Sequence, residues 1–178
     1  MTKIETVSII YQHPKILLGM KKVRFGKSLY NGFGGGKEEY ETIEECALRE
    51  TFEETGGILE ERETLEEYIK KEGAKEKSGI IMLNSIKVGN ILFHFQSDEN
   101  NHDVHFFKAT KFIGIPTETK EMRPEQFHID KIPYEQMWPD DKYWLPLLLN
   151  GKLFRGEFEF NLEGKIATYE LKEVSGLD

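Results

Sequence analysis

The chain has 178 residues, of which 38% are hydrophobic and 12% aromatic, as in folded globular proteins and unlike disordered ones. Its formal net charge of −8 gives no indication of a nucleic-acid polymer as partner. The single cysteine excludes an intrachain disulfide and no apolar run suggests a signal peptide or a membrane span, so we expect one cytoplasmic domain over residues 1–178.

The beginning of the chain predicts two strands followed by a turn-rich loop. Residues 6–11 and 15–20 are rich in β-branched and aliphatic side chains, and His13 with Pro14 would turn the chain between them. Residues 26–36 contain five glycines, a composition typical of turns that expose the backbone. A ligand could therefore approach the main chain closely in this loop.

An acidic helix is expected next. Thr42 and Glu45 have the spacing of a capping box, which predicts the start of the helix, and Gly56 with Gly57 predicts its end. The following segment, an insertion at about residues 59–83, is highly charged and predicts a surface helix and a polar loop that add no second core.

The second half predicts further strands and one more helix. We expect strands over residues 87–95 and 103–110, a turn supplied by Asn100 to His102, a short strand after Pro124, a helix within 137–149 that Asp140 could cap, and a closing hairpin over 152–160 and 165–174. Strands dominate, with two or three helices interposed. This order predicts an α+β domain in which a mixed β-sheet is sandwiched between helices, an α/β/α arrangement.

Three carboxylates of the acidic helix would lie on one face. Glu50, Glu53 and Glu54 stand at i, i+3 and i+4, where like charges destabilise an isolated helix. One interpretation is a solvated acidic face without a ligand. The other is a site for Mg²⁺, or Mn²⁺, because clustered carboxylate oxygens bind these ions together with substrate phosphates.

A longer motif favours the second interpretation. Its fixed positions are Gly35, Glu41, Arg49, Glu50, Glu53, Glu54 and Gly56. With this spacing the chain resembles the Nudix hydrolase family, which uses divalent metal to cleave nucleoside diphosphates linked to another group. Thr51 and Gly57 depart from the aliphatic residues that the family prefers there, but neither position is a ligand.

The resemblance continues outside the motif. The segments "NGFGG", "DVHFF", "EMRP" and "MWPDDKYWLPLLL" resemble family members that hydrolyse oxidised purine nucleoside triphosphates such as 8-oxo-dGTP. It covers nearly the whole chain except the insertion. It implies the Nudix fold and hydrolysis to a nucleoside monophosphate and pyrophosphate, which removes damaged nucleotides from the pool.

The resemblance also implies roles for single residues. The metal ligands would be the carbonyl group of Gly34 and the carboxylates of Glu50, Glu53, Glu54 and Glu121. Arg49 would orient the helix carboxylates, and we favour Glu53 as general base, with Glu121 next. Asn31, Asp140 and Asp141 would read the purine edge and Trp138 would stack on it. Other pocket-lining positions would be Thr6, Lys21, Phe25, Phe93, Phe95, Met122 and Trp144.

A family-independent reading of the aspartates is also open: Asp140 could cap the helix and Asp141 could be a first-turn acid favoured by the helix dipole. Three residues depart from the implied subfamily. Gly36 replaces a lysine, Tyr40 replaces a glycine, and His102 replaces an apolar residue near the pocket mouth. These departures concern the phosphate-side loop and base specificity.

The remaining alternatives are a Nudix hydrolase of another substrate and a Nudix-fold binding module without catalysis. The first would be indicated by a basic channel or an extra domain, and the second by loss of motif glutamates; the sequence has neither feature. We expect a small-molecule nucleotide as partner, no nucleic-acid polymer, no membrane, and a monomer, with a dimer as the open alternative.

Overall fold

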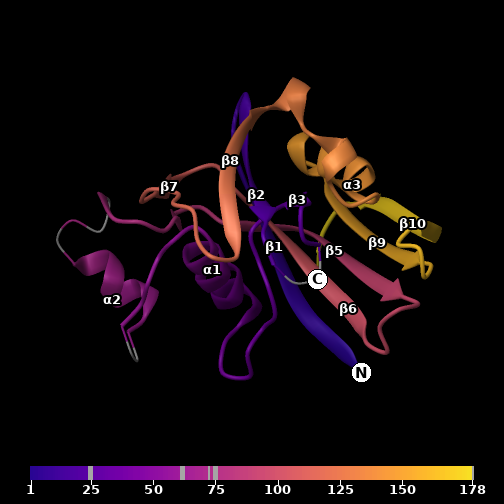
Figure 1. Ribbon diagram of the computed structural model, residues 1–178, viewed down its shortest axis with the longest axis horizontal. Helices are drawn as coiled ribbons and strands as arrows, with labels where there is room; N and C mark the ends of the chain where they lie inside the picture. The colour runs from indigo at the N-terminus through magenta and orange to yellow at the C-terminus, as the bar shows by residue number, and fades with distance from the viewer. Residues whose placement is uncertain (24–25, 61–62, 72, 74–75, 178) are drawn as a thin grey trace.

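The computed structural model describes residues 1–23, 26–60, 63–71, 73 and 76–177 (Figure 1). Its strands are β1 (Thr2–Gln12), β2 (Lys15–Lys21), β3 (Tyr30–Asn31), β4 (Ile81–Met82), β5 (Ile86–Phe95), β6 (Asn101–Ala109), β7 (Phe112–Ile113), β8 (Met122–His128), β9 (Leu153–Phe160) and β10 (Ile166–Val174). Its helices are α1 (Ile43–Glu54), α2 (Leu65–Lys70) and α3 (Asp141–Leu149), with short 3₁₀ turns η2 (Ile129–Lys131) and η3 (Tyr134–Gln136). Among the described residues, no helix is long and apolar enough to cross a membrane.

The main sheet is mixed, as predicted. Its strand order is β10-β9-β5-β6-β1-β2-β3, and β8 also pairs with β2. The pairs β1–β6 and β5–β9 are parallel, whereas β1–β2, β5–β6 and β9–β10 are antiparallel. The predicted closing hairpin of β9 and β10 therefore extends this sheet at the β5 side.

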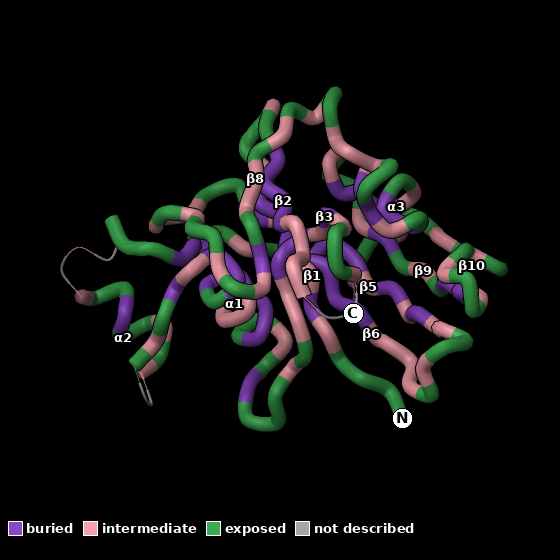
Figure 2. The backbone as a smooth tube through the Cα atoms, in the orientation of Figure 1, coloured by how far each residue is buried: buried purple, intermediate pink, exposed green. Residues whose placement is uncertain are grey.

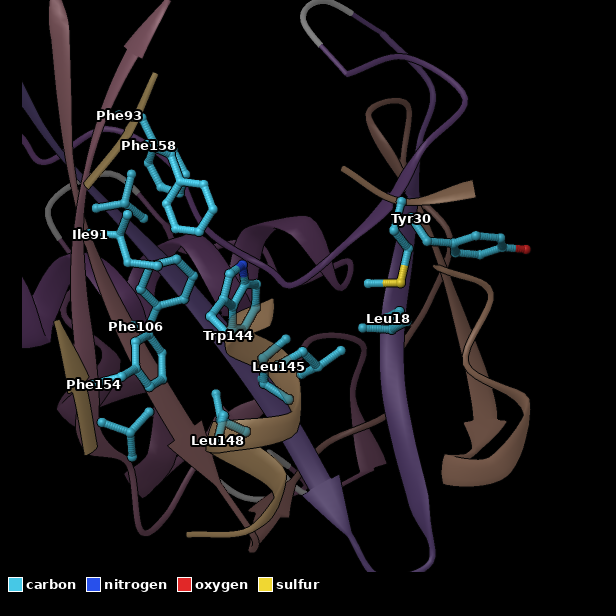
Figure 3. Close-up of a cluster of buried hydrophobic side chains, with 14 of the residues drawn as sticks. Leu18, Tyr30, Ile91, Phe93, Phe106, Trp144, Leu145, Leu148, Phe154 and Phe158 are labelled. Atoms are coloured by element: carbon cyan, nitrogen blue, oxygen red, sulfur yellow. The ribbon is translucent and has the colours of Figure 1, made fainter. Parts of the chain in front are cut away.

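The two faces of the sheet carry separate cores. On one face, Trp144, Leu145 and Leu148 of α3 point toward aromatic side chains of the strands, among them Phe106 and Phe158 (Figure 3). On the other face, Ala47 of α1 packs with residues such as Ile10 and Phe107. The alternation of β1 and β6 between these clusters is the period-2 pattern of a strand buried on both sides. Figure 2 shows the buried stretches along the central strands. The sheet is thus sandwiched between α1 and α3.

A glycine-rich segment, residues 32–36, separates β1 from β2 along part of their length. The two strands pair only near their hairpin, from Ile10 with Leu17 to Gln12 with Lys15. Farther along β1, the partners are Phe33 opposite Ser8 and Gly36 opposite Glu5. A Cβ at Gly34 would collide with the backbone carbonyl of Thr6, so only glycine allows this close approach. The strands consequently diverge and leave room for a cavity.

Several boundaries differ from the predictions. β8 begins at Met122 and includes Pro124, which is tolerated because β8 pairs only with β2 among the described strands. The turn predicted from Asn100 to His102 is wrong in part, because β6 already begins at Asn101. The predicted helix within 137–149 begins only at Asp141, after η3.

The insertion contributes more packing than its sequence predicts. Its helix, α2, has the expected surface position but buries Tyr68 against Phe52 of α1, with ring centroids 4.8 Å apart. Ile81 of β4 completes this small cluster. The insertion was expected to be a surface helix and a polar loop without a second core, but among its described residues it buries four side chains: Tyr68, Ile80, Ile81 and Met82.

Candidate active site

One cavity of about 470 Å³ lies on the α3 face of the sheet and reaches the glycine-rich segment. Its volume is in the range of pockets that hold small molecules. Its walls combine aromatic side chains with a few polar ones, and they include nine of the predicted substrate-binding residues: Thr6, Lys21, Asn31, Phe93, Phe95, Trp138, Asp140, Asp141 and Trp144. The structure therefore brings most of the predicted pocket together from five separate segments of the chain.

Two adjacent aspartates lie at the most buried wall of the cavity. Asp140 is 4% exposed and Asp141 is 2% exposed. Asp140 occupies the N-cap position of α3, but its side chain makes no capping hydrogen bond. It accepts a hydrogen bond of 3.0 Å from Nε1 of Trp144, one helical turn later. The capping prediction for Asp140 is thus wrong, and its carboxylate faces the interior.

The aspartate pair resists full ionisation. Burial raises the pKa of Asp140 from 3.8 to about 6. Burial also raises the pKa of Asp141 well above its ordinary value, and the charge of Asp140 raises it further. Among the described residues, Oδ2 of Asp141 has no hydrogen-bond partner. A carboxylic acid that keeps its proton can donate to a ligand while its neighbour accepts.

Aromatic rings line the remaining walls. Phe93 and Phe95 extend from β5, and the Trp138 ring meets Phe95 edge to face with centroids 6.0 Å apart. Asn31 lies at the end of β3, where its Oδ1 accepts from the backbone N–H of Gly32 at 2.8 Å. That bond fixes the amide and orients its NH₂ group for donation elsewhere. The wall chemistry suits a flat heteroaromatic ring with hydrogen-bonding edges.

The acidic helix begins and ends as predicted. Thr42 and Glu45 form a capping box, with hydrogen bonds of 2.7 Å and 3.1 Å. The helix ends at Glu54, and Gly56, two residues later, has a φ of +96°. Thr51 and Phe52, on the opposite side from the glutamates, are fully buried. Packing of that side overcomes the repulsion among the carboxylates.

Arg49 organises the carboxylates from the centre of α1. Its Nε and Nη2 atoms donate to both oxygens of Glu41, at 2.9 Å and 2.7 Å. Its Nη1 atom donates to Glu50 at 2.8 Å and to Glu53 at 3.2 Å. Burial alone would raise the pKa of Glu41, but the bonds from Arg49 and the Glu38 backbone outweigh it and lower the pKa. The two-pronged contact fixes the guanidinium plane, so Arg49 has the orienting position that was predicted.

Glu54 is the most buried of the three helix glutamates. Its Oε2 accepts from the Gly34 N–H at 2.9 Å, and its Oε1 lies 3.6 Å from Nζ of Lys21. Burial raises its pKa to about 7, against the opposing effect of Lys21. Burial likewise raises the pKa of Glu50, whose oxygen would lie only 2.6 Å from a Cβ at Gly35. The glycine segment and α1 are therefore in direct contact at these two carboxylates.

The donor set is suited to a hard divalent cation. The carboxylates of Glu50 and Glu54 are partly or largely buried, and burial disfavours their charged forms. The negative charge of Glu121 near Glu54 disfavours ionisation of Glu54 further, and a cation would relieve this. In the arrangement described, Arg49 and Lys21 supply the facing positive charge. Within the described part of the chain, no three His, Cys, Asp or Glu side chains already converge as a metal-holding group. The predicted ligands Gly34, Glu50, Glu53, Glu54 and Glu121 remain a hypothesis.

One predicted pocket residue that the structure describes, Met122, is not among the cavity walls. Met122 is 1% exposed and belongs to the core on the α1 face, where a Cβ at Gly19 would meet its sulfur atom. It supports β2 from behind the site. Phe25 lies outside the described residues. Cys46 is buried, and burial raises the pKa of its thiol to about 11, which agrees with a structural role.

The structure adds cavity residues that sequence reasoning missed. They come mainly from β1, β6 and the β5–β6 turn and include Lys3, Glu5, Val7, Ser97, Asp98 and Phe106. Alternation along β1 could have placed Glu5 and Val7 on one face. The parallel pairing of β1 with β6, about 100 residues apart, has no local signal in the sequence.

Comparisons with known proteins agree with this geometry. A family model described as "NUDIX domain" matches residues 2–148. The chain is 41% identical over 173 residues to a mouse (Mus musculus) protein named "Oxidized purine nucleoside triphosphate hydrolase", covering 97% of this chain and 96% of the relative. A zebrafish (Danio rerio) protein of the same name is 40% identical over 176 residues, covering 99% and 98%. A MutT protein structure from Bacillus halodurans superposes with a TM-score of 0.74 at 22% identity, covering 96% and 97%, a likeness of fold alone.

Proposed function

This chain belongs to the NUDIX domain family, and from that premise we propose that it is a nucleoside triphosphate pyrophosphohydrolase. Its substrates are oxidised or modified purine nucleoside triphosphates such as 8-oxo-dGTP, and its products are the nucleoside monophosphate and pyrophosphate. Two relatives at 41% and 40% identity carry names of this activity. The biological result is sanitation of the cytoplasmic nucleotide pool, which prevents damaged bases from entering DNA and other nucleic acids.

One observation carries the proposal: a single cavity joins an aromatic pocket to the glycine segment that contacts the carboxylate helix. Asp140, Asp141 and Trp138 line its interior, and Gly34 and Gly35 line it where the backbone contacts Glu54 and Glu50. A nucleotide has the same two-part chemistry, a flat base and a chain of phosphates. The cavity thus accounts for both ends of one ligand.

The base would be read by polar groups among the aromatic walls. Trp138 offers a face for stacking, and Asn31 offers an amide NH₂ group. Because burial opposes the loss of both protons, one of Asp140 and Asp141 donates while the other accepts. This pair can exchange donor and acceptor roles, so it can match more than one oxidised purine edge.

The phosphate end would use the loop and helix. Lys21, 24% exposed in its side chain, lies beside Glu54 at the cavity wall and can contact a phosphate oxygen. Arg49 holds Glu50 and Glu53 in fixed orientations. Glu53 is the most exposed carboxylate of the three, so it can take the proton of a water that attacks phosphorus. Glu121 is the second candidate for that role.

Hydrolases of this family use divalent metal ions, and we propose Mg²⁺, with Mn²⁺ as the alternative, held by Gly34, Glu50, Glu53, Glu54 and Glu121. When bound, such an ion neutralises phosphate charge and favours attack at phosphorus. The buried carboxylates contribute the oxygen donors for it, and Arg49 contributes their orientation.

A substrate panel tests the proposal. Purified protein is incubated with normal, oxidised and methylated purine nucleoside triphosphates, with and without Mg²⁺, and pyrophosphate release is measured. We expect the highest kcat/KM for an oxidised purine and no turnover after chelation. Release of inorganic phosphate, or equal turnover of all nucleotides, would contradict the proposal. Trp138→Ala should raise KM for the preferred substrate and leave the metal requirement unchanged.

A further inference from the structure

A histidine joins two carboxylates at the rim of the cavity. Nδ1 of His102 lies 3.1 Å from Oε2 of Glu5, and its Nε2 lies 3.2 Å from Oδ2 of Asp98. Both contacts are hydrogen bonds at once only when both ring nitrogens donate. The His102 ring also meets Phe95 edge to face, with centroids 5.4 Å apart. The ring is therefore held from three directions, and Glu5, Asp98 and His102 all line the cavity.

The two carboxylates are not equivalent. Oδ1 of Asp98 accepts from the backbone and side chain of Asn100, and Oδ2 accepts from Lys3 and His102, so its acceptor capacity is used. Glu5 accepts from His102 through Oε2, and no described residue donates to its Oε1. The Glu5 side chain is 30% exposed. Asp98 thus anchors the ring, whereas Glu5 retains an acceptor at the cavity.

Glu5 lies between the two halves of the site. Its backbone bridges Gly36, and the next residue, Thr6, donates its N–H to the Gly35 carbonyl at 2.9 Å. On the other side, the His102 ring that contacts Glu5 also contacts Phe95 of the aromatic pocket. If a nucleotide has its base in the aromatic pocket and its phosphates at the glycine segment, Glu5 lies on the wall between them, where the sugar would be.

We infer that Glu5, oriented by His102, accepts a hydrogen bond from the 2′-hydroxyl of the nucleotide sugar and makes this chain favour ribonucleoside over deoxyribonucleoside triphosphates. This inference rests on the proposed function. A carboxylate suits the role because it only accepts and a sugar hydroxyl donates, as in dinucleotide sites where an acidic side chain binds ribose. Glu5 is a specificity residue in this assignment, and His102 is a positioning residue.

The test compares two substrates that differ by one oxygen atom, 8-oxo-GTP and 8-oxo-dGTP. We expect wild-type kcat/KM to be about tenfold higher for the ribonucleotide, the range of a hydrogen bond to a charged group. Glu5→Leu should bring the ratio of the two kcat/KM values near one, because kcat/KM falls more for 8-oxo-GTP than for 8-oxo-dGTP. Glu5→Gln, which conserves size and one acceptor, should give an intermediate ratio and serves if the leucine variant does not fold.

His102→Leu should lower the ratio in the same direction, because it releases Glu5 without removing it. A merely structural role for His102 would lower both kcat/KM values together and leave their ratio unchanged. The matched control is Glu157→Leu. Glu157 pairs with His94 at 2.6 Å on the same sheet but does not line the cavity, so its loss should not change the ratio.

Binding of the products separates this inference from the proposed function. Titration calorimetry with 8-oxo-GMP and 8-oxo-dGMP needs no turnover. If neither triphosphate is hydrolysed, the proposed function fails, and the ratio of the two dissociation constants still tests Glu5. Suppose that hydrolysis occurs but Glu5→Leu leaves both the kcat/KM ratio and the dissociation-constant ratio unchanged, including by weakening the ribo- and deoxyribonucleotides equally. The Glu5 inference is then wrong and the proposed function stands.

Discussion

The indole Nε1 of Trp144 donates a hydrogen bond of 3.0 Å to Oδ2 of Asp140, and both side chains are buried. Trp144 also packs on Phe106, with ring centroids 4.4 Å apart, so one residue joins the aromatic core to the polar wall of the cavity. The geometry of the pair sets where the Asp140 carboxylate lies, and we propose that this carboxylate reads the base. Stability and recognition are therefore coupled at this contact.

Trp144→Phe should destabilise the protein by about 2–4 kcal/mol. The change leaves Asp140 buried without its donor and removes part of a large ring from the core. Urea unfolding measures the loss. A double-mutant cycle with Asp140→Leu separates the hydrogen bond from the packing, and we expect a coupling of about 1 kcal/mol or more. A coupling near zero would mean that packing alone accounts for the cost.

Stability should fall as pH rises through about 6. The folded pKa of Asp140 is raised from 3.8 to about 6, so its protonated form is favoured in the folded state. The contribution of protonated Asp140 to the free energy of unfolding is fully present below about pH 4 and is lost above about pH 6. At roughly 1.4 kcal/mol per pKa unit, this contribution is at most about 3 kcal/mol. Asp140→Asn, which still accepts from Trp144, should gain stability relative to wild type between pH 5 and 8.

Asp130→Asn is the control for this pH dependence. It makes the same Asp-to-Asn change at a side chain that is 79% exposed, in η2. Urea midpoints over the same pH series give both comparisons. Parallel curves for wild type and Asp140→Asn would show that the aspartate pair ionises as readily in the folded protein as in the unfolded chain.

Glu53→Gln and Glu54→Gln should each lower kcat by about a hundredfold or more while the fold is retained. Each replaces a carboxylate of the proposed metal and base site by an isosteric amide, and the Glu54 variant still accepts from the Gly34 N–H. Turnover is measured over a range of Mg²⁺ concentrations. Glu44→Gln, in the exposed first turn of the same helix, is the matched control. Near wild-type turnover in both variants would rule out the metal assignment.

Local features of this chain could be predicted from sequence because their determinants are close together. The Thr42–Glu45 capping box needs three residues of spacing, and four of the seven fixed motif residues lie on one helix. The same local reasoning left open that Asp140 caps the helix, but its side chain accepts from the buried Trp144 indole instead. A capping position is a tendency that a buried partner overrides.

Contacts between distant segments could not be predicted. His102 bonds to Glu5 across 97 residues through the parallel pairing of β1 and β6. No local pattern distinguishes that pairing from an antiparallel one. Without it, His102 was placed in a turn rather than on a strand that faces the cavity. The family resemblance predicted the aromatic walls and put His102 near the pocket mouth, whereas the contacts of His102 with Glu5 and Asp98 required the fold.

The insertion should matter for stability and not for chemistry. Tyr68 of α2 is 6% exposed and packs edge on Phe52, on the side of α1 that faces away from Glu50 and Glu53. Tyr68→Ala should therefore cost about 2–4 kcal/mol in urea unfolding, the range for truncating a buried ring. Because the carboxylates are held separately by Arg49, kcat/KM measured well below the unfolding temperature should stay within about twofold of wild type. Ile69→Ala, 40% exposed on the same helix, is the control and should cost less than about 1 kcal/mol. A large loss of kcat/KM in folded Tyr68→Ala would instead show that α2 positions the catalytic helix, and the insertion would then belong to the active site.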